Sequence, residues 1–511
     1  MCYRVSSWFV AVLGTGTAWP AATYYLSPTG GDGAAGDAQH PWRTFAHVIP
    51  KLEAGDTLMF KDGQYTRSNS RGMRIVAGEG AHSGNSLAPI TVKAEHERRA
   101  FLHSDGSYDP LVMDGCSYWT VEGIHVEKAD NDSRAGRSTD SNVLVHQCNH
   151  ITLRRLLVAR NNRYANSHLL NLFDSHHCLV EESEFYYFHR HGLVLWHGSS
   201  RNTIRRCYFN SPEYAAIPGG YGSANHRGDN AINPYSAGAH NLAEDCITEG
   251  NSAGYGIDAD WRYDNDSNVV KGLISLNDTF GLLLKSRAEG RKTHLFKERD
   301  TLVENVLVLA SLEAACYCRG NENTRIKHLT SVGGTGGGLL VDVEGGYPDE
   351  PPYSVFAENS TVSGTLGTGY NMTEMTDWGL AHCNSYGNRT NWSPGATDPH
   401  ITHGLSVKPN WRTSNYTWIS DGASVNCPNL HGVGKNGEDI GANVFYRYRG
   451  GVLTEQPLWD PTTGEFPHGA IVAGVNDVSG ASAFDVHQRL HVSLATLPPG
   501  YGVTEVKEKR R

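Results

Sequence analysis

A short motif that recurs along the chain constrains its fold more than any other feature. In each copy an apolar or small residue is followed three positions later by another, and polar or charged residues usually lie between them. Successive copies begin 23 to 39 residues apart. Repeats of this length that pack only on their neighbours build a solenoid, and one repeat accommodates the three short strands and turns of a β-helix coil. The copies begin at Val121, Leu153, Val180, Ile204, Ala243, Val270, Val303 and Ile326.

A second strand, often introduced by glycine, follows in several repeats. Side chains alternate between the two faces of a strand, so one set is expected to fill the interior and the other to face outward. The expected interior residues are Leu193, Leu195, Ile257, Ala259, Leu282 and Leu284. The expected outward residues are Val194, Trp196, Asp258, Asp260, Leu283 and Lys285. Cys207 and Cys246 hold equivalent ladder positions and are interpreted as small interior residues. These patterns predict an all-β chain folded as a right-handed parallel β-helix.

The two ends of the chain differ from the repeats and are expected to cap the solenoid. The segment from Thr44 to Leu52 is interpreted as a short helix beside the first strands. Open solenoid ends need such cover for their apolar side chains and unpaired strand edges. We therefore place the β-helix with its N-terminal cap at residues 23–384. The Trp-, Pro- and Gly-rich residues 385–511 are predicted to form an irregular C-terminal cap packed on the last coils.

Residues 1–22 have the character of an export signal peptide. Arg4 precedes an apolar stretch from Trp8 to Trp19, and the small residues Ala21 and Ala22 follow it. The stretch is short for a membrane span, and no later segment has a spanning pattern. We expect a secreted protein, extracellular or periplasmic, that is a monomer with no membrane partner. The net charge of −10, with no basic stripe before the last few residues, argues against nucleic acid as a partner.

Ionisable residues recur on one expected outward face over consecutive coils, where neighbouring strands lie roughly 5 Å apart. Asp229 comes from one coil, Asp258 and Asp260 from the next, and Lys285 from the third. Such a column is unusual for a purely structural surface and indicates a functional cleft. Its continuation and its upstream neighbours are Tyr317, Arg319, Asp342, Glu344, His189, Arg190 and His191. The residues expected to bind the sugar chain are Trp196, His189, His191, Trp261 and Tyr317.

Three segments of these coils resemble the central coils of family 9 polysaccharide lyases, a group of pectate-lyase-type β-helices. They are Gly228–Ile232, Asn251–Asp258 and Gly281–Lys285. The resemblance implies that Asp229 and Asp258 bind calcium and that Lys285 is the catalytic base. We add Asp260 as a third calcium ligand and Arg319 as a second catalytic residue.

The resemblance implies β-elimination from a uronic-acid-containing polysaccharide. The base removes the proton next to the carboxylate, and the developing enediolate gains negative charge. A calcium ion, or an arginine such as Arg319, would stabilise that charge. Oxygen ligands of the Asp type suit calcium. A lysine can accept a proton only while its amine is uncharged, and neighbouring positive charge favours the uncharged amine.

Two other functions remain open at this stage. A β-helix glycoside hydrolase would use paired carboxylates, for which Asp229, Asp258 and Asp260 are candidates. The tripeptide Arg325-Ile-Lys327 is similar to one in polygalacturonase-type hydrolases, but the other elements of that family are missing and we interpret the match as chance. A non-catalytic carbohydrate-binding surface protein would keep exposed aromatic residues and need no acid–base column. His168, His176 and His177 lack the spacing of a zinc site and are interpreted as structural.

Overall fold

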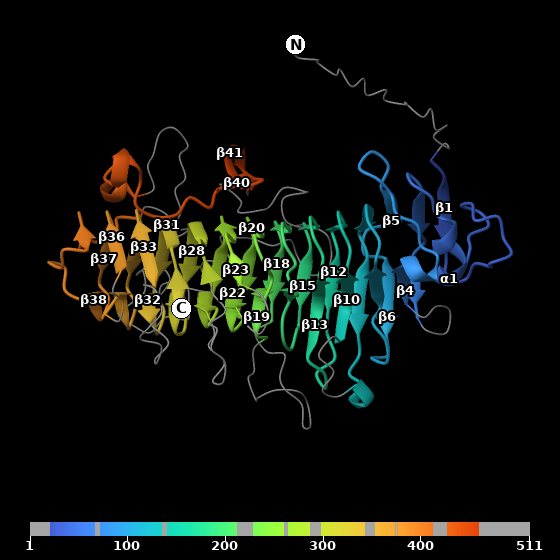
Figure 1. Ribbon diagram of the computed structural model, residues 1–511, viewed down its shortest axis with the longest axis horizontal. Helices are drawn as coiled ribbons and strands as arrows, with labels where there is room; N and C mark the ends of the chain where they lie inside the picture. Colours follow the sequence, from blue (N-terminus) through green and yellow to red (C-terminus); the bar gives the residue numbers. More distant parts are fainter. Residues whose placement is uncertain are drawn as a thin grey trace, which may run out of the picture.

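The computed structural model describes residues 21–66, 72–134, 140–211, 228–259, 264–286, 298–342, 353–373, 375, 377–411 and 427–458. Almost all regular structure in these ranges is β-strand. Figure 1 shows the coils stacked along the long axis, from β1 at the N-terminal end to β38 at the other. The described part of the chain contains no helix with the length and apolar character needed to cross a bilayer.

Two long sheets run the length of the stack, and their neighbouring strands pair in parallel. The 12-stranded sheet, here sheet B, receives one strand from each coil. The 24-stranded assembly, here sheet A, receives up to two. This arrangement confirms the predicted all-β parallel β-helix. Sheet B contains β4 (Met73–Val76), β7 (Leu111–Asp114), β10 (Asp140–His146), β13 (Ser167–Phe173), β16 (Leu193–Trp196), β19 (Asn230–Tyr235), β22 (Ala253–Ala259), β26 (Phe280–Ser286), β29 (Ala314–Arg319), β32 (Gly337–Asp342), β35 (Thr368–Asn371) and β38 (Thr390–Ser393).

The strands of sheet A are short, and most lie on either side of a corner in the coil. They are β1 (Thr23–Leu26), β2 (Thr57–Phe60), β3 (Gly63–Tyr65), β5 (Ile90–Ala94), β6 (Ala100–Ser104), β8 (Trp119–Glu122), β9 (His125–Lys128), β11 (Thr152–Arg154), β12 (Leu157–Ala159), β14 (Leu179–Glu181), β15 (Glu184–Tyr186), β17 (Thr203–Arg205), β18 (Tyr208–Asn210), β20 (Leu242–Glu244), β21 (Ile247–Glu249), β24 (Val269–Lys271), β25 (Ile274–Leu276), β28 (Leu302–Leu309), β31 (Thr324–Val332), β33 (Ser354–Glu358), β34 (Thr361–Ser363), β36 (Asp377–Ala381), β37 (Asn384–Tyr386) and β39 (Ile401–Thr402).

The recurrent motif is the corner between two strands of sheet A. Its third residue has a left-handed backbone in every copy, with φ of 69° at Gly123, 57° at Arg155 and 53° at Asn305, for example. One left-handed residue bends the chain, so that the residues on both sides of the bend point inward. The three-residue spacing in the sequence therefore marks a corner, and both of its apolar or small positions are at most 2% exposed in every copy.

The interior of sheet B agrees with the predicted alternation. Leu193, Leu195, Ile257, Leu282 and Leu284 are all fully buried. The side chain of Ala259 lies outside the described residues. Nine cysteines of the described chain are buried and free, and they include Cys207 and Cys246 at the predicted interior positions.

Buried asparagines tie successive coils together at another corner. The backbone N–H of Asn202 donates to Asn241 Oδ1 at 3.0 Å, and the N–H of Asn241 donates to Asn268 Oδ1 at 3.0 Å. Each amide thus satisfies a backbone group of the coil beside it, which a buried polar group must do to avoid a desolvation cost.

The N-terminal end carries the expected short helix. It consists of α1 (Phe45–Val48) followed by the 3₁₀ turn η1 (Ile49–Lys51). Thr44 caps it, because its Oγ1 accepts a hydrogen bond from the N–H of His47 at 3.3 Å. Phe45 packs into the core with its ring centroid 5.3 Å from that of Phe60. The predicted signal peptide falls almost wholly on residues 1–20, outside the described ranges.

At the other end the coils continue past residue 385, since β38 pairs with β35 and β39 pairs with β36. Residues 427–458 then run back along the outside of the coils as far as β20 and include the hairpin of β40 (Tyr446–Arg449) and β41 (Val452–Pro457) (Figure 1). The N–H of Tyr448 donates to Asp245 Oδ2 at 2.7 Å. This segment therefore lies along the solenoid rather than over its open end.

A buried carboxyl group lies within the small third sheet, which consists of β23 (Asn265–Asp266), β27 (Glu298–Arg299) and β30 (Asn321–Glu322). Glu298 is fully buried, pairs with Asn265 and Asn321 in the neighbouring coils, and accepts a hydrogen bond from Thr301 Oγ1. Its Oε2 has no hydrogen-bond partner. Burial, with smaller contributions from Asp266 and Cys318, raises the pKa of Glu298 well above its ordinary value, so the group is held as the neutral acid.

Glu298→Gln should stabilise the protein increasingly as the pH rises. When the pKa of a group is higher in the folded state than in the unfolded state, its contribution to stability is complete at pH values below the unfolded-state pKa. Above that pH the contribution falls by about 1.4 kcal/mol per pH unit until the folded-state pKa is reached. An amide cannot ionise, so the variant lacks this loss. Urea unfolding at pH 5 and pH 8 measures it, with the exposed Glu455→Gln as control. Equal pH dependence in wild type and Glu298→Gln would contradict a neutral Glu298.

Candidate active site

Residues on successive strands of sheet B share one register level and form a continuous row. Lys285 pairs with Arg319 on the next strand, and Arg319 pairs with Asp342 on the strand after it. Asp258 pairs with Lys285 from the other side. The structure therefore brings together four residues of the predicted column, one strand spacing apart. We call this the outer row, and its members are Trp196, Tyr235, Asp258, Lys285, Arg319 and Asp342.

A cleft with a volume of about 570 Å³ lies beside the outer row. The Tyr317 hydroxyl donates to Asp342 Oδ2 at 2.8 Å, and Arg319 Nε lies 3.9 Å from the same oxygen. The ring of Phe280 stacks on that of Tyr317 with centroids 5.8 Å apart. Tyr317 is thus held on two sides and borders the cleft. The lining residues are Phe280, Leu312, Glu313, Tyr317, Gly336, Leu340, Val341, Asp342 and Asn371.

Asp229 does not stack on Asp258 as the sequence suggested. It lies just before β19, and its carbonyl accepts from the N–H groups of Ser252 and Ala253, so it is level with the start of β22. Tyr235 is the residue that pairs with Asp258. The sequence shows that each coil contains an aspartate but does not show at which end of its strand each one lies.

Asp229 still shares an electrostatic environment with Lys285. Its carboxylate forms an ion pair with Arg190. Burial raises the pKa of Asp229 above its ordinary value, and the positive charges of Arg190, His189 and Lys285 reduce that rise without cancelling it. The outward side of β26 and the turn before β19 therefore border one common region.

Two histidines close to this region are shielded from solvent. The sequence predicted a binding role for His191 and a structural role for His168. His168 and His191 are both buried, and their rings stack with centroids 5.1 Å apart. Asn233 Nδ2 lies 3.0 Å from His191 Nε2. Burial lowers the pKa of His168 to about 3, and burial followed by the charges of Arg190, His168 and Lys285 lowers that of His191 far below its ordinary value. Both imidazoles are therefore neutral.

The remaining predicted binding residues differ in burial, and some of them are not described by the structure. Trp196 is half-buried, with its ring centroid 6.4 Å from that of His168 and 5.8 Å from that of Tyr235. His189 is buried, and its N–H donates to Asn161 Oδ1 at 2.9 Å. Trp261 and Asp260 lie outside the described residues, as does the side chain of Asp258. Within the described ranges no three His, Cys, Asp or Glu side chains are grouped so as to hold a metal ion.

Three polar residues of this face were not predicted from the sequence. Asn171 and Asn233 point outward from sheet B yet are buried, and neither side-chain atom of Asn171 nor Oδ1 of Asn233 has a hydrogen-bond partner. Glu313 lines the cleft from the turn before β29. A polar residue between two inward leucines, as in Leu170-Asn171-Leu172, was the available signal for Asn171. Buried amides without partners are rare in folded proteins, so Asn171 and Asn233 are unusual features of this face.

His168 and His191 should remain uncharged from pH 8 down to pH 5, because burial strongly disfavours the imidazolium form. The ¹⁵N chemical shifts of their ring nitrogens measure this, with His168→Phe and His191→Phe used to assign the signals. An imidazolium pattern for either ring at pH 6 would contradict the buried arrangement.

Comparisons with known proteins give only weak likenesses. No family model matches the chain, and no curated protein matches it. Among solved structures, the pectate lyase Pel9A is 15% identical with a TM-score of 0.41, and the match covers 82% of this chain and 95% of that one. A GH136 lacto-N-biosidase from Eubacterium ramulus is 11% identical with a TM-score of 0.46, covering 71% and 67%. A PL6 family polysaccharide lyase from Pseudopedobacter saltans is 10% identical with a TM-score of 0.36, covering 71% and 91%. The fold of this chain is therefore defined by its own strand pairing.

Proposed function

We propose that the protein is a polysaccharide lyase that cleaves a uronic-acid-containing polysaccharide by β-elimination. The observation that carries this proposal is the pairing of Lys285 with Arg319 on adjacent strands, both half-buried, beside a cleft of about 570 Å³. A chain with a net charge of −10 needs such local positive charge to attract an anionic polymer.

In this proposal Lys285 is the base and Arg319 holds the substrate carboxylate. The proton on the carbon next to the carboxylate moves to Lys285 Nζ, and the electron pair of that C–H bond forms a C=C bond to the neighbouring carbon. The bond from that carbon to the glycosidic oxygen breaks, and the leaving oxygen takes a proton from water. The guanidinium of Arg319 offers a planar pair of donors that fits a carboxylate and stabilises its developing charge.

The residues around this pair would position the sugar chain. Asp342 holds the hydroxyl of Tyr317, so that its ring presents a fixed face to the cleft. Trp196 lies on the same register level as Lys285, three strands away, and is half-buried. His191 is buried, so as a neutral imidazole it would support the residues around the site rather than hydrogen-bond the sugar chain itself.

Calcium is a further part of the proposal, with Asp258 and Asp260 as its ligands. Asp229, which the resemblance also implies as a ligand, forms an ion pair with Arg190, and we leave it out of the proposed ligand set for that reason. Calcium bound there would supply additional positive charge for the substrate carboxylate. The reaction described above uses only the cations of the chain itself.

We further propose that residues 1–22 direct export and that the protein acts as a monomer outside the cytoplasm, where such polymers are met.

The lyase proposal predicts product that absorbs in the ultraviolet. Purified protein should release unsaturated ends from one member of a panel of uronate polymers, and Lys285→Ala should lower the rate about a thousandfold, as expected for loss of a general base. Lys93→Ala, also an outward residue of a strand but in β5 of sheet A, is the matched control and should leave the rate unchanged. Reducing ends without ultraviolet absorbance would rule out the lyase.

Reducing ends without ultraviolet absorbance would favour a glycoside hydrolase, and one observation supports this alternative. Two carboxylates, Glu313 and Asp342, line the same cleft, as an acid and a nucleophile or base would. Binding without any product would instead indicate a non-catalytic carbohydrate-binding protein.

Chelation tests the calcium part separately. We expect EDTA to reduce formation of unsaturated product and added Ca²⁺ to restore it, whereas Asp229→Asn should leave this calcium dependence intact because Arg190 already occupies that carboxylate. Full activity in EDTA would remove calcium from the proposal and leave Arg319 as the group that neutralises the substrate. Loss of calcium dependence in Asp229→Asn would return Asp229 to the ligand set.

A further inference from the structure

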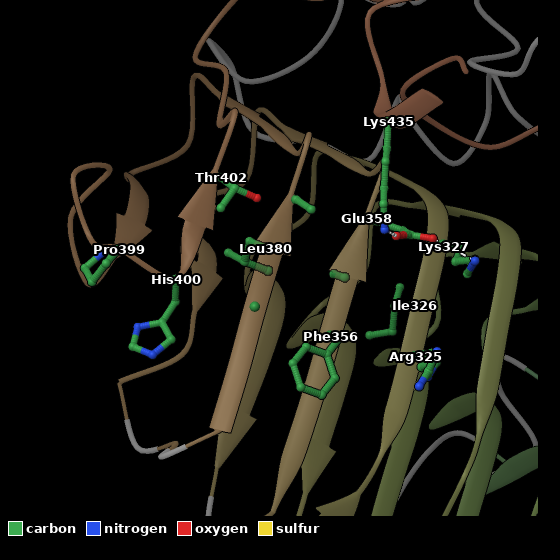
Figure 2. A pocket seen from close by; sticks show the side chains of 13 residues that line it. Arg325, Ile326, Lys327, Phe356, Glu358, Leu380, Pro399, His400, Thr402 and Lys435 are labelled. Carbon is green, nitrogen blue, oxygen red and sulfur yellow. Dashed lines mark hydrogen bonds and ion pairs between the residues drawn. The ribbon is translucent and has the colours of Figure 1, made fainter. Parts of the chain in front are cut away.

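A second cleft, with a volume of about 450 Å³, lies on the outward side of sheet A near the C-terminal coils. Strands β31, β33 and β36 form its floor, His400 borders it at one end, and Lys435 reaches it from the segment that runs back along the coils. Figure 2 shows Phe356 on this floor, between His400 and Arg325. The cleft is on a different sheet from Lys285 and Arg319, so it is separate from the proposed active site.

The floor presents an aromatic ring that the neighbouring coil leaves uncovered. Phe356 is 37% exposed, unusual for a phenylalanine in the middle of a sheet. Its register partner is Gly379, and a Cβ at that position would lie only 3.2 Å from the Phe356 ring. Because Gly379 has no side chain, the Phe356 ring can lie against the backbone there and keep an accessible face. An exposed aromatic face is what the apolar face of a sugar ring packs against.

The rim of this cleft carries more positive than negative charge. Lys327 and Lys435 both contact Glu358, each at 2.7 Å. Burial raises the pKa of Glu358, but the hydrogen bonds from the two lysines outweigh it and lower the pKa, so the carboxylate stays charged. Arg325 is exposed and, within the described chain, forms no ion pair; its Nε lies 3.4 Å from Asn323 Oδ1. Three cations against one carboxylate leave an excess of two positive charges.

We propose that this cleft is an accessory binding site for an acidic polysaccharide, with one sugar ring stacked on Phe356 and its carboxylate paired with Arg325. The rigid strands β31 and β33 place the guanidinium and the ring on neighbouring coils, since Arg325 and Phe356 are register partners. Such a site holds the polymer without acting on it. The proposal does not depend on β-elimination, because a hydrolase or a binding protein would use the site in the same way.

The test uses the full chain with Lys285→Ala, so that the ligand is not consumed. Isothermal titration with a polygalacturonate oligomer is expected to show two sites per chain, and Phe356→Ala or Arg325→Gln should weaken one of them about tenfold, the loss typical of removing a stacking or charge-paired anchor. Binding at that site should weaken as NaCl is raised. Phe356→Tyr keeps the ring and should retain binding. Tyr386→Ala and Arg389→Gln, an exposed aromatic and an arginine outside the cleft, are the matched controls.

Three outcomes would overturn this inference. Unchanged binding in both cleft variants, with thermal unfolding showing intact folds, would exclude the site. Equal binding of the neutral polymer dextran would exclude recognition of charge. Equal binding of polyglutamate with the same dependence on Phe356 would indicate an acidic peptide as the occupant. Failure of the proposed active site would look different, because a single site would then remain and Phe356→Ala would still weaken binding there.

Discussion

Parallel hydrogen bonding between successive coils is the constraint on which this structure depends. A backbone that pairs in register repeats each side-chain position one strand spacing further along the axis. Interior positions must therefore accept a neighbour of the same kind, and the paired positions Val121, Leu153 and Val180 show this. Outward positions form rows for the same reason. Lys285 and Arg319 are neighbours only because their strands pair, although one complete coil separates them along the chain.

Corners impose the second condition on the fold. A coil can close only if the chain bends sharply several times, and here a left-handed residue makes the bend between paired strands of sheet A. Most of these positions are occupied by residues other than glycine, as at Arg155 and Glu182, so the energetic cost of the bend is carried by the packing on both sides. Asn241 and its partners then satisfy the backbone groups that another corner leaves without strand partners.

Charge is distributed unevenly over this acidic solenoid. Several carboxylates of the described residues are paired with local cations, as Glu358 is with Lys327 and Lys435, and burial favours the neutral form of Glu298. Both clefts have an arginine nearby: Arg325 lines the second cleft as the register partner of Phe356, and Arg319 lies on the same strand as Tyr317, which lines the first.

The sequence by itself determined the solenoid, because a corner repeats the same residue types in every coil and the pattern survives variation in loop length. It also placed Asp258, Lys285, Arg319 and Asp342 on one side, since alternation along a strand is local. Only the tertiary structure decided the register, and with it the position of Asp229 at the start of its strand and its pairing with Arg190. It also decided that Asn171 is buried and that Phe356 is not, because burial depends on what neighbouring coils and returning segments cover, which no local pattern encodes.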